Sequence, residues 1–227
     1  VLRRQSAFPL YLYNRAQACY ALWQYDNALL DLTAALRQNK KFYPAYGLVG
    51  AVLAQKGDFK RAAKAYNKAL SVNREYAYAH LGLAALELAQ GRQEEGFHEF
   101  EIAVRLNSDD YAPYFNRAEA YWREGKREEA LTDYRRALNA ASLEPQYAIA
   151  LGDRFRQAAF WKEALSAYNR AYDLAGAKIS KFGSGVTGKI SAKPSATISE
   201  LGLRALIHRS AAYEALKDQK AAMADLT

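Results

Sequence analysis

The sequence predicts an all-α protein, a right-handed α-solenoid built from antiparallel helix pairs. Three observations support this fold class. The chain has 227 residues, of which 51% are hydrophobic and 25% charged, and this composition excludes a wholly disordered or collagen-like chain. Five segments of the sequence align at a constant spacing of 34 residues. Tyr occurs 17 times and Ala recurs throughout, whereas Pro occurs only 5 times, which is typical of closely packed helices.

The repeats are defined by columns of small residues. The first column consists of Ala28, Ala62, Gly96, Ala130 and Ala164. Seven residues later in each repeat stand Ala35, Ala69, Ala103, Ala137 and Ala171. Twelve residues before the first column stand Ala16, Gly50, Ala84, Ala118 and Gly152. A column of large residues, Leu32, Tyr66, Phe100, Tyr134 and Tyr168, lies between the first two. Small residues facing large ones let two helix backbones approach, so each repeat is expected to be a helix pair.

Two breaks divide each period into a helix A and a helix B. The first break carries a glycine that suits the end of a helix in three repeats: Gly57, Gly91 and Gly125. In repeats one and five the same place holds Trp23-Gln24 and Ala159-Phe160. The second break is marked by Asn39, Asn73 and Asn107. Helix A therefore precedes the first break, and helix B runs from it to the second.

This pattern resembles the tetratricopeptide repeat family, whose unit is a helix–turn–helix of 34 residues with small residues in these columns. The resemblance covers residues 9–177, and residues 1–8 form an N-terminal lead-in. The five repeats are residues 9–42, 43–76, 77–110, 111–144 and 145–177. The proline that the family often has after helix B is replaced here by Lys40, Arg74, Ser108 and Ser142. The resemblance implies a protein-interaction module.

A basic insertion and a truncated sixth repeat are expected after the fifth repeat. Residues 178–196 are rich in Gly, Ser and Lys, and we expect them to form a loop. Residues 197–227 restart the repeat pattern, with Ala222 in the column of Ala28. The pattern stops in the middle of helix B. Because a solenoid normally ends in a polar capping surface, we expect the chain to be part of a longer protein.

The insertion contains an apparent phosphate-binding motif, Gly183-Ser184-Gly185-Val186-Thr187-Gly188-Lys189. A P-loop requires a Ser or Thr hydroxyl where Ile190 stands, and it requires a preceding β-strand rather than a helix. We therefore interpret the segment as a basic loop and not as a nucleotide site. An anion or phosphopeptide contact remains open for four lysines: Lys178, Lys181, Lys189 and Lys193.

Residues with catalytic potential are scattered through the repeats. His80, His98 and His208 lie in different repeats and lack metal-ligand spacing. Cys19 stands among small residues with no nearby histidine, which favours a buried structural thiol over a nucleophile. Clustered glutamates beside Arg and Lys indicate a solvated helix face. We therefore expect no enzymatic activity, no cofactor and no metal site.

The candidate binding surface is the concave side, which the helix A series lines in such a solenoid. We expect an aromatic groove at repeats one and four, an apolar one at two and three, and charge toward five. Repeats one to three contribute Tyr13, Asn14, Gln17, Tyr20, Leu48, Leu81 and Leu88. Repeats four and five contribute Phe115, Asn116, Glu119, Trp122, Ile149, Asp153 and Arg156.

This groove predicts a partner protein that presents a peptide, a helix or an extended apolar segment. Some members of the family clamp a chaperone's C-terminal carboxylate with a Lys, Asn and Arg set. Here Asn14 and Asn116 match its middle Asn, but the flanking repeats lack the other members. Two alternatives remain open: a structural spacer, or a recruiting arm of a larger protein or complex. We expect no membrane span, because no apolar run approaches the roughly 20 residues required.

Nucleic acid is the lesser alternative, suggested by the net charge of +8. The excess lies toward the ends of the chain. Residues 1–42 carry 6 basic and 2 acidic side chains, residues 43–177 carry 18 of each, and residues 178–227 carry 8 and 4. A nucleic-acid reader normally needs a continuous basic stripe. The neutral central part therefore argues against RNA binding.

Overall fold

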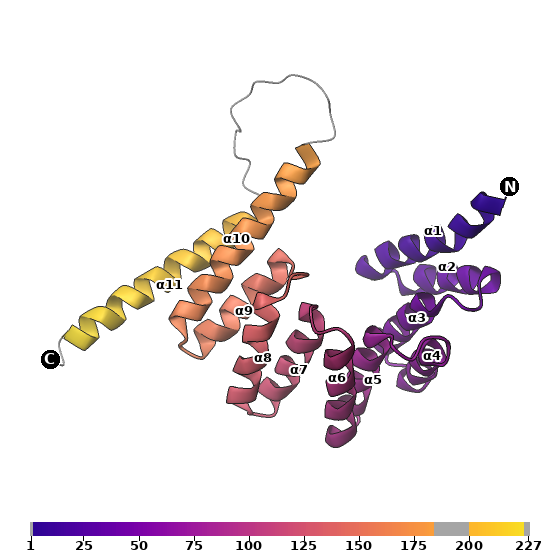
Figure 1. The fold of residues 1–227 in the computed structure, drawn as a ribbon, viewed down its shortest axis with the longest axis horizontal. Coiled ribbons are helices and arrows are strands. Elements are labelled where there is room, and N and C mark those ends of the chain that lie inside the picture. The colour runs from indigo at the N-terminus through magenta and orange to yellow at the C-terminus, as the bar shows by residue number, and fades with distance from the viewer. Residues whose placement is uncertain (1, 184–199, 225–227) are drawn as a thin grey trace. The chain divides into compact units, whose positions relative to one another are not determined.

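The computed structural model describes residues 2–183 and 200–224, which confirm the all-α solenoid class. Eleven helices and no strand occur in these residues (Figure 1). The chain divides into two compact units, residues 1–108 and 109–227. Helices of the first unit are α1 (Leu2–Ala21), α2 (Tyr25–Gln38), α3 (Tyr43–Gln55), α4 (Phe59–Val72), α5 (Ala77–Ala89) and α6 (Gln93–Leu106). Helices of the second are α7 (Tyr111–Arg123), α8 (Arg127–Asn139), α9 (Pro145–Gln157), α10 (Trp161–Gly183) and α11 (Glu200–Ala224).

Consecutive helices pack as pairs within each unit. In the first unit these are α1 with α2, α3 with α4 and α5 with α6, and α3 also packs against α5. In the second unit α7 packs on α8, α9 on α10, and α11 on both α10 and α9. The odd-numbered helices are the helices A of the repeats, and α2, α4, α6, α8 and α10 are the helices B.

The small columns form the contact between paired helices. Ala28, Ala62, Ala130 and Ala164 are all completely buried, and so are the alanines seven residues after each. The large column fills the space beside them, with Tyr134 and Tyr168 completely buried. The sequence pattern therefore identified the residues that hold the two helices of each pair together.

The turn between helices A and B needs a residue with positive φ. Gly57, Gly91 and Gly125 occupy it with φ of 79°, 77° and 75°. Trp23 and Ala159 make the same turn with φ of 62° in the first and fifth repeats. A non-glycine residue costs about 1–2 kcal/mol there, which the packing of the following helix B must offset.

Asparagine ends helix B where proline is absent. The side-chain oxygens of Asn39 and Asn73 accept hydrogen bonds from the backbone N–H groups of Lys41 and Glu75, each at 3.0 Å. The asparagine backbone is extended at both positions. These Asx-type turns stop the helix by giving the backbone a local partner outside it.

Three boundaries differ from those expected. Helix α1 begins at Leu2, so the lead-in is helical from that residue. Helix α10 continues to Gly183, beyond the expected start of the insertion loop at residue 178. The sixth repeat requires a turn near Lys217, but α11 is a single helix to Ala224. Residues 214–224 contain no Gly, Pro or Asn, and their Ala, Leu, Lys, Gln and Met favour an unbroken helix. Residues 184–189 of the apparent phosphate-binding motif, and Lys193, lie outside the described part of the chain.

Candidate partner-binding site

A cavity of about 430 Å³ opens on the helix A side of the first unit. Its lining comes from α1, α3, α4 and the start of α5. The lining residues are Tyr13, Gln17, Gly47, Leu48, Ala51, Tyr66, Tyr76 and Tyr78. None of them carries a charge at neutral pH, and four are tyrosines. The cavity can therefore accept apolar groups on its walls and hydrogen-bonding groups at the phenol oxygens.

Glycine makes room for the tyrosine rings in this cavity. A Cβ added to Gly47 would lie 2.6 Å from Cε1 of Tyr76, and one added to Gly50 would lie 2.6 Å from Cε1 of Tyr66. Gly82 on α5 also faces the ring of Tyr66. Gly50 and Gly82 have no side chain, so the ring of Tyr66 fits between the backbones of α3 and α5.

Aromatic contacts hold the other rings of the cavity. Tyr76 packs against Tyr43 with ring centroids 5.0 Å apart and against Tyr78 at 6.0 Å. Tyr13 meets Phe42 edge-on at 5.3 Å, and its hydroxyl accepts a hydrogen bond of 3.3 Å from Gln17. Burial raises the pKa of the Tyr13, Tyr66 and Tyr76 phenols above their ordinary value. These hydroxyls therefore stay protonated and can donate as well as accept.

The same face of the second unit is filled by polar contacts instead. Tyr134 donates to Glu119 at 2.7 Å, and Arg154 donates to both oxygens of Glu119 at 2.6 and 2.8 Å. Burial opposes ionisation of Glu119, but the bonds from Arg154 and Tyr134 keep its pKa below the ordinary value. Glu119 is therefore an ionised internal partner of two side chains.

The fifth repeat carries a related arrangement around Asp153. Its Oδ1 accepts a hydrogen bond of 2.8 Å from the hydroxyl of Tyr168 and lies 2.9 Å from Nδ1 of His208 on α11. Arg156 lies 3.7 Å from the same oxygen. The carboxylate thus links α9, α10 and α11.

The structure separates the predicted groove residues into three groups. Asn14, Gln17, Asn116 and Arg156 are exposed. Tyr13, Tyr20, Leu48, Leu88, Phe115, Glu119, Trp122 and Asp153 are half-buried. Leu81 and Ile149 are buried, at 9% and 3% exposure, and cannot line a groove. Both stand at the repeat position of Tyr13 and Gly47, which line the cavity, so the burial of this position differs from one repeat to another.

The cavity brings together Tyr13, Gln17 and Leu48 of the predicted set, all in the first unit. The aromatic residues expected in repeat four are used for packing. Phe115 meets Tyr147 edge-on at 5.4 Å, and the guanidinium of Arg127 lies 3.8 Å from the ring centroid of Trp122. The amide of Asn116 donates to the carbonyl of Ala112 at 2.8 Å.

Tyr66, Tyr76 and Tyr78 also line the cavity, although none of them was among the predicted groove residues. The signal was the unusual pair of glycines in the second repeat, Gly47 and Gly50, on a helix A. Interior glycines lower helix stability, so two of them in one helix indicate that something large approaches its backbone.

Groups able to bind metal or act as nucleophiles are sparse. No cluster of three or more His, Cys, Asp or Glu side chains suitable for a metal ion occurs among the described residues. Cys19 is a half-buried free thiol on α1. Within residues 2–183 and 200–224, no helix combines the length and apolar character needed to cross a membrane.

Fold and repeated helix pairs define the class: an α-solenoid of stacked helix–turn–helix repeats. A tetratricopeptide repeat model matches residues 43–76 and 111–142, the second and fourth repeats. The chain therefore contains tetratricopeptide repeats and has the fold of proteins built from them. This confirms the resemblance seen in the sequence. Proteins of this fold serve in general as protein-interaction scaffolds.

Two relatives and one solved structure are similar to parts of this chain. Human superkiller complex protein 3 is 28% identical over 90 residues, which are 40% of this chain and 6% of that protein. Small glutamine-rich tetratricopeptide repeat-containing protein 2 of Mycosarcoma maydis is 35% identical over 77 residues, 34% of this chain and 22% of that protein. A thermophilic tetratricopeptide repeat protein of Thermus thermophilus shares the fold, with a TM-score of 0.62 at 20% identity, over 76% of this chain and 94% of that one.

Proposed function

We propose that this chain is a non-catalytic scaffold segment that binds an uncharged, apolar segment of a partner protein on the helix A face of its first unit. The observation that carries the proposal is the tyrosine-lined cavity between α1, α3 and α5, which has no charged lining residue. Tyrosine is enriched at interfaces because one end of its ring is apolar and the other forms hydrogen bonds. Tyr78 is 51% exposed and Leu48 is half-buried, so both offer contact area to a partner.

The second unit supports a different role for its helix A face. Glu119 and Asp153 bind internal hydroxyls and cations, and they occupy the repeat position of Ala51. A face whose polar groups already have partners gains little by binding another segment. We therefore place the partner on the first unit alone, rather than along all five repeats.

A recruiting arm or spacer is the second candidate. It is supported by the lengths of the two relatives, because the matched residues make up only 6% and 22% of those proteins. As a recruiting arm, the first unit would still bind a segment, and an activity would reside elsewhere in a larger protein or complex. As a spacer, the chain would dock through its convex side and the groove would stay empty.

The substitution Ala51→Glu tests the site by filling the cavity. Glu119 stands at this position in the fourth repeat, where it accepts a hydrogen bond of 2.7 Å from Tyr134, the residue that corresponds to Tyr66. The variant should therefore keep its helical content. The matched control is Ala85→Glu, which makes the same change at the exposed equivalent position of the third repeat, outside the cavity.

The original chain, Ala51→Glu and Ala85→Glu are each immobilised and exposed to a cell extract. Mass spectrometry then identifies the proteins that each one retains. The expected result is a set retained by the original chain and by Ala85→Glu but lost with Ala51→Glu. Equal retention by Ala51→Glu would place the binding elsewhere, and no specific retention by the original chain would contradict the scaffold function itself.

A further inference from the structure

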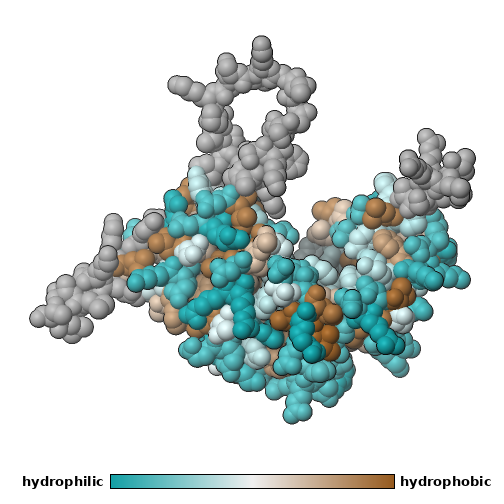
Figure 2. All heavy atoms as spheres, in the orientation of Figure 1, coloured by the Kyte–Doolittle hydropathy of each residue, from teal (hydrophilic) through white to brown (hydrophobic). Residues whose placement is uncertain are grey.

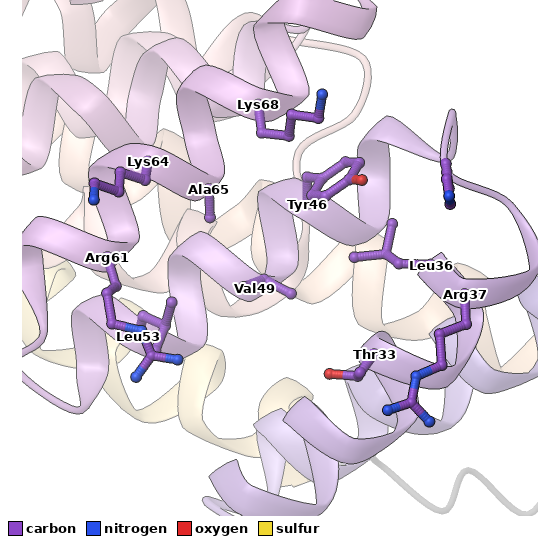
Figure 3. A pocket seen from close by; sticks show the side chains of 11 residues that line it. Thr33, Leu36, Arg37, Tyr46, Val49, Leu53, Arg61, Lys64, Ala65 and Lys68 are labelled. Carbon is purple, nitrogen blue, oxygen red and sulfur yellow. The ribbon is translucent and has the colours of Figure 1, made fainter.

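A second hollow of about 560 Å³ lies on the first unit, between α2, α3 and α4 (Figure 3). We call it the helix B groove, because α2 and α4 form its sides. Side chains of α3 form much of its floor. The floor is apolar and consists of Leu36, Tyr46, Val49, Leu53 and Ala65. Leu53 and Ala65 are buried, and the other three are half-buried, so apolar surface is available at the bottom of the groove.

Every charged residue that lines the helix B groove is basic. Its charged residues are Arg37, Lys40, Arg61, Lys64 and Lys68, and all five are exposed. Figure 3 shows Arg61, Lys64 and Lys68 along α4, with Arg37 across the groove on α2. Arg61 forms an ion pair of 3.3 Å with Asp58 at the start of α4. Among the described residues, no ion pair is formed by the other four cations.

The local sequence concentrates positive charge here. Residues 33–74 contain nine basic side chains and one acidic side chain, Asp58. Like charges that face one another across a groove repel, and this raises the free energy of the isolated protein. An anionic ligand in the groove would remove that repulsion and gain Coulomb energy at several points.

Other repeats carry their own counter-charges at the equivalent positions. Val49 and Ala65 correspond to Arg15 and Asp31 in the first repeat and to Arg117 and Asp133 in the fourth. There the arginine makes two hydrogen bonds to the aspartate, at 2.5 and 2.6 Å in the first repeat and at 2.6 and 2.9 Å in the fourth. The second repeat alone combines a small, apolar pair of residues with a basic rim.

The equivalent positions between α8 and α10 hold an ion pair. Arg135 and Glu163 stand at the positions of Thr33 and Arg61, and they form an ion pair of 3.1 Å between the two helices B. In the helix B groove the same two positions hold a threonine and an arginine, which cannot neutralise one another. The acidic partner that the second unit supplies internally is missing from the first.

We propose that the helix B groove binds an acidic amphipathic segment of a partner protein. Apolar side chains of the segment would contact Val49, Leu36 and Tyr46. Its carboxylates would pair with Lys64 and Lys68 on α4, with Arg37 on α2 and with Lys40 just after α2. This site is separate from the tyrosine-lined cavity and does not depend on it. A single chain would thus bind one uncharged and one acidic segment on two faces of its first unit.

The floor favours a peptide over a nucleic acid. Single-stranded nucleic acids bind through bases stacked on exposed aromatic rings above a basic track. The floor has one half-buried aromatic ring, Tyr46, and otherwise aliphatic side chains. Leucine or isoleucine side chains on an acidic helix match that floor, whereas phosphates and ribose do not.

The experiment uses fluorescence anisotropy with the full chain and three labelled probes. One is a short synthetic helix with Leu on one face and Glu on the other. The second has Lys in place of every Glu, and the third is a single-stranded oligo-uridine. We expect saturable binding of the acidic helix only, weakened by salt. Tighter binding of oligo-uridine, or no binding of the acidic helix, would overturn the proposal.

Two variants test the rim and the floor separately. The double substitution Lys64→Glu and Lys68→Glu should weaken binding of the acidic helix at least about tenfold. The double substitution Val49→Arg and Ala65→Asp keeps the net charge and installs the pair seen in the first and fourth repeats. It should fill the floor and weaken binding by about tenfold as well.

Matched controls separate these effects from charge and folding. Lys60→Glu with Arg105→Glu makes the same net change at exposed residues outside the groove, and should alter affinity by less than about twofold. Ala51→Glu should leave binding of the acidic helix unchanged. A defined groove would be contradicted by either of two results. One is an equal loss of affinity in the rim variant, Lys64→Glu with Lys68→Glu, and in its control, Lys60→Glu with Arg105→Glu. The other is undiminished binding by the floor variant, Val49→Arg with Ala65→Asp.

Discussion

The second and fourth repeats both consist of a packed helix pair, but they have different side chains at the positions next to the small columns. In the fourth repeat Arg117 binds Asp133, and Glu119 binds Tyr134 and Arg154. In the second repeat the four corresponding positions hold Val49, Ala65, Ala51 and Tyr66. Two hollows open at those places, one on each side of the helix pair. The fourth repeat therefore has hydrogen-bonded ion pairs at these positions, whereas the second repeat has uncharged residues that line two hollows.

This contrast shows that the small columns determine helix packing, whereas the positions next to them determine which surfaces are left open. The small columns are buried in both repeats and set the approach of the two helices. Positions next to the columns carry either a salt bridge or a small apolar residue, and the fold accepts both. Most of the visible surface is hydrophilic and carries separate hydrophobic patches (Figure 2). Binding surfaces therefore depend on substitutions at a few positions in each repeat.

The largest expected effect comes from removing one partner of the buried ion pair in the fourth repeat. Asp133→Ala leaves the guanidinium of Arg117, whose side chain is only 12% exposed, without its bidentate partner. The free energy of unfolding should fall by about 3–5 kcal/mol, as is typical when a buried charge loses its partner. Urea denaturation followed by circular dichroism measures the loss.

The first repeat supplies the matched control for that substitution. Asp31→Ala removes the equivalent carboxylate, but the side chain of Arg15 is 52% exposed and can be solvated. Its loss of stability should be clearly smaller. Equal losses for Asp31→Ala and Asp133→Ala would mean that burial does not distinguish the two ion pairs.

An intermediate effect is expected from crowding the tyrosine of the second repeat. Gly50→Ala places a methyl group 2.6 Å from Cε1 of Tyr66 and should cost about 1–3 kcal/mol through overpacking. Adding Tyr66→Leu should recover part of the loss, because the first repeat combines Ala16 with Leu32 in these columns. Thermal denaturation of the single and double variants measures the coupling. Strictly additive losses would show that the ring and the methyl group do not compete for space.

The smallest effect concerns the third repeat, where Glu99 replaces Ala65 and binds His80. Nδ1 of His80 lies 2.6 Å from Oε2 of Glu99, and this hydrogen bond, opposed by burial, raises the pKa of His80 above its ordinary value of 6.5. A raised pKa in the folded state stabilises the protein below the unfolded pKa. That stabilisation, under about 1 kcal/mol, is lost as pH rises through the folded value.

Denaturation of the original chain and of His80→Gln at several pH values checks this sign. The original chain should lose stability relative to the variant as pH rises from about 6 through the folded pKa. A parallel pH dependence in the two proteins would show that His80 does not carry the charge in the folded state. Nδ1 and Nε2 shifts in NMR spectra report its titration directly.

Much of the fold was predictable because repeats align without insertions through residue 177. The columns of Ala28 and Ala35 predicted the helix contacts, and Gly57, Gly91 and Gly125 predicted the turns. The end of α10 and the unbroken α11 were not predicted. Helix formers continue past both expected boundaries. The turns without glycine, at Trp23 and Ala159, are each followed by a helix B that packs against the preceding helix A.

The binding surfaces were only partly predictable. Tyr13, Gln17 and Leu48 line a cavity, whereas Leu81 and Ile149 are buried. Phe115 and Trp122 contact other side chains of the second unit. Averaging charge over residues 43–177 also hid the helix B groove. Its cations belong to one repeat and its neighbour, while the acidic residues that balance the sum lie in later repeats.

The sequence by itself determined the repeat length, the helix pairs and the residues between them, because close packing of two helices requires small residues at fixed intervals. Tertiary structure alone decided which side chains between those columns are satisfied internally. Arg117 and Val49 occupy the same position in their repeats, and only the neighbouring helices decide what each one contacts. An arginine there finds an aspartate 16 residues away, whereas a valine there leaves a hollow edged with lysines.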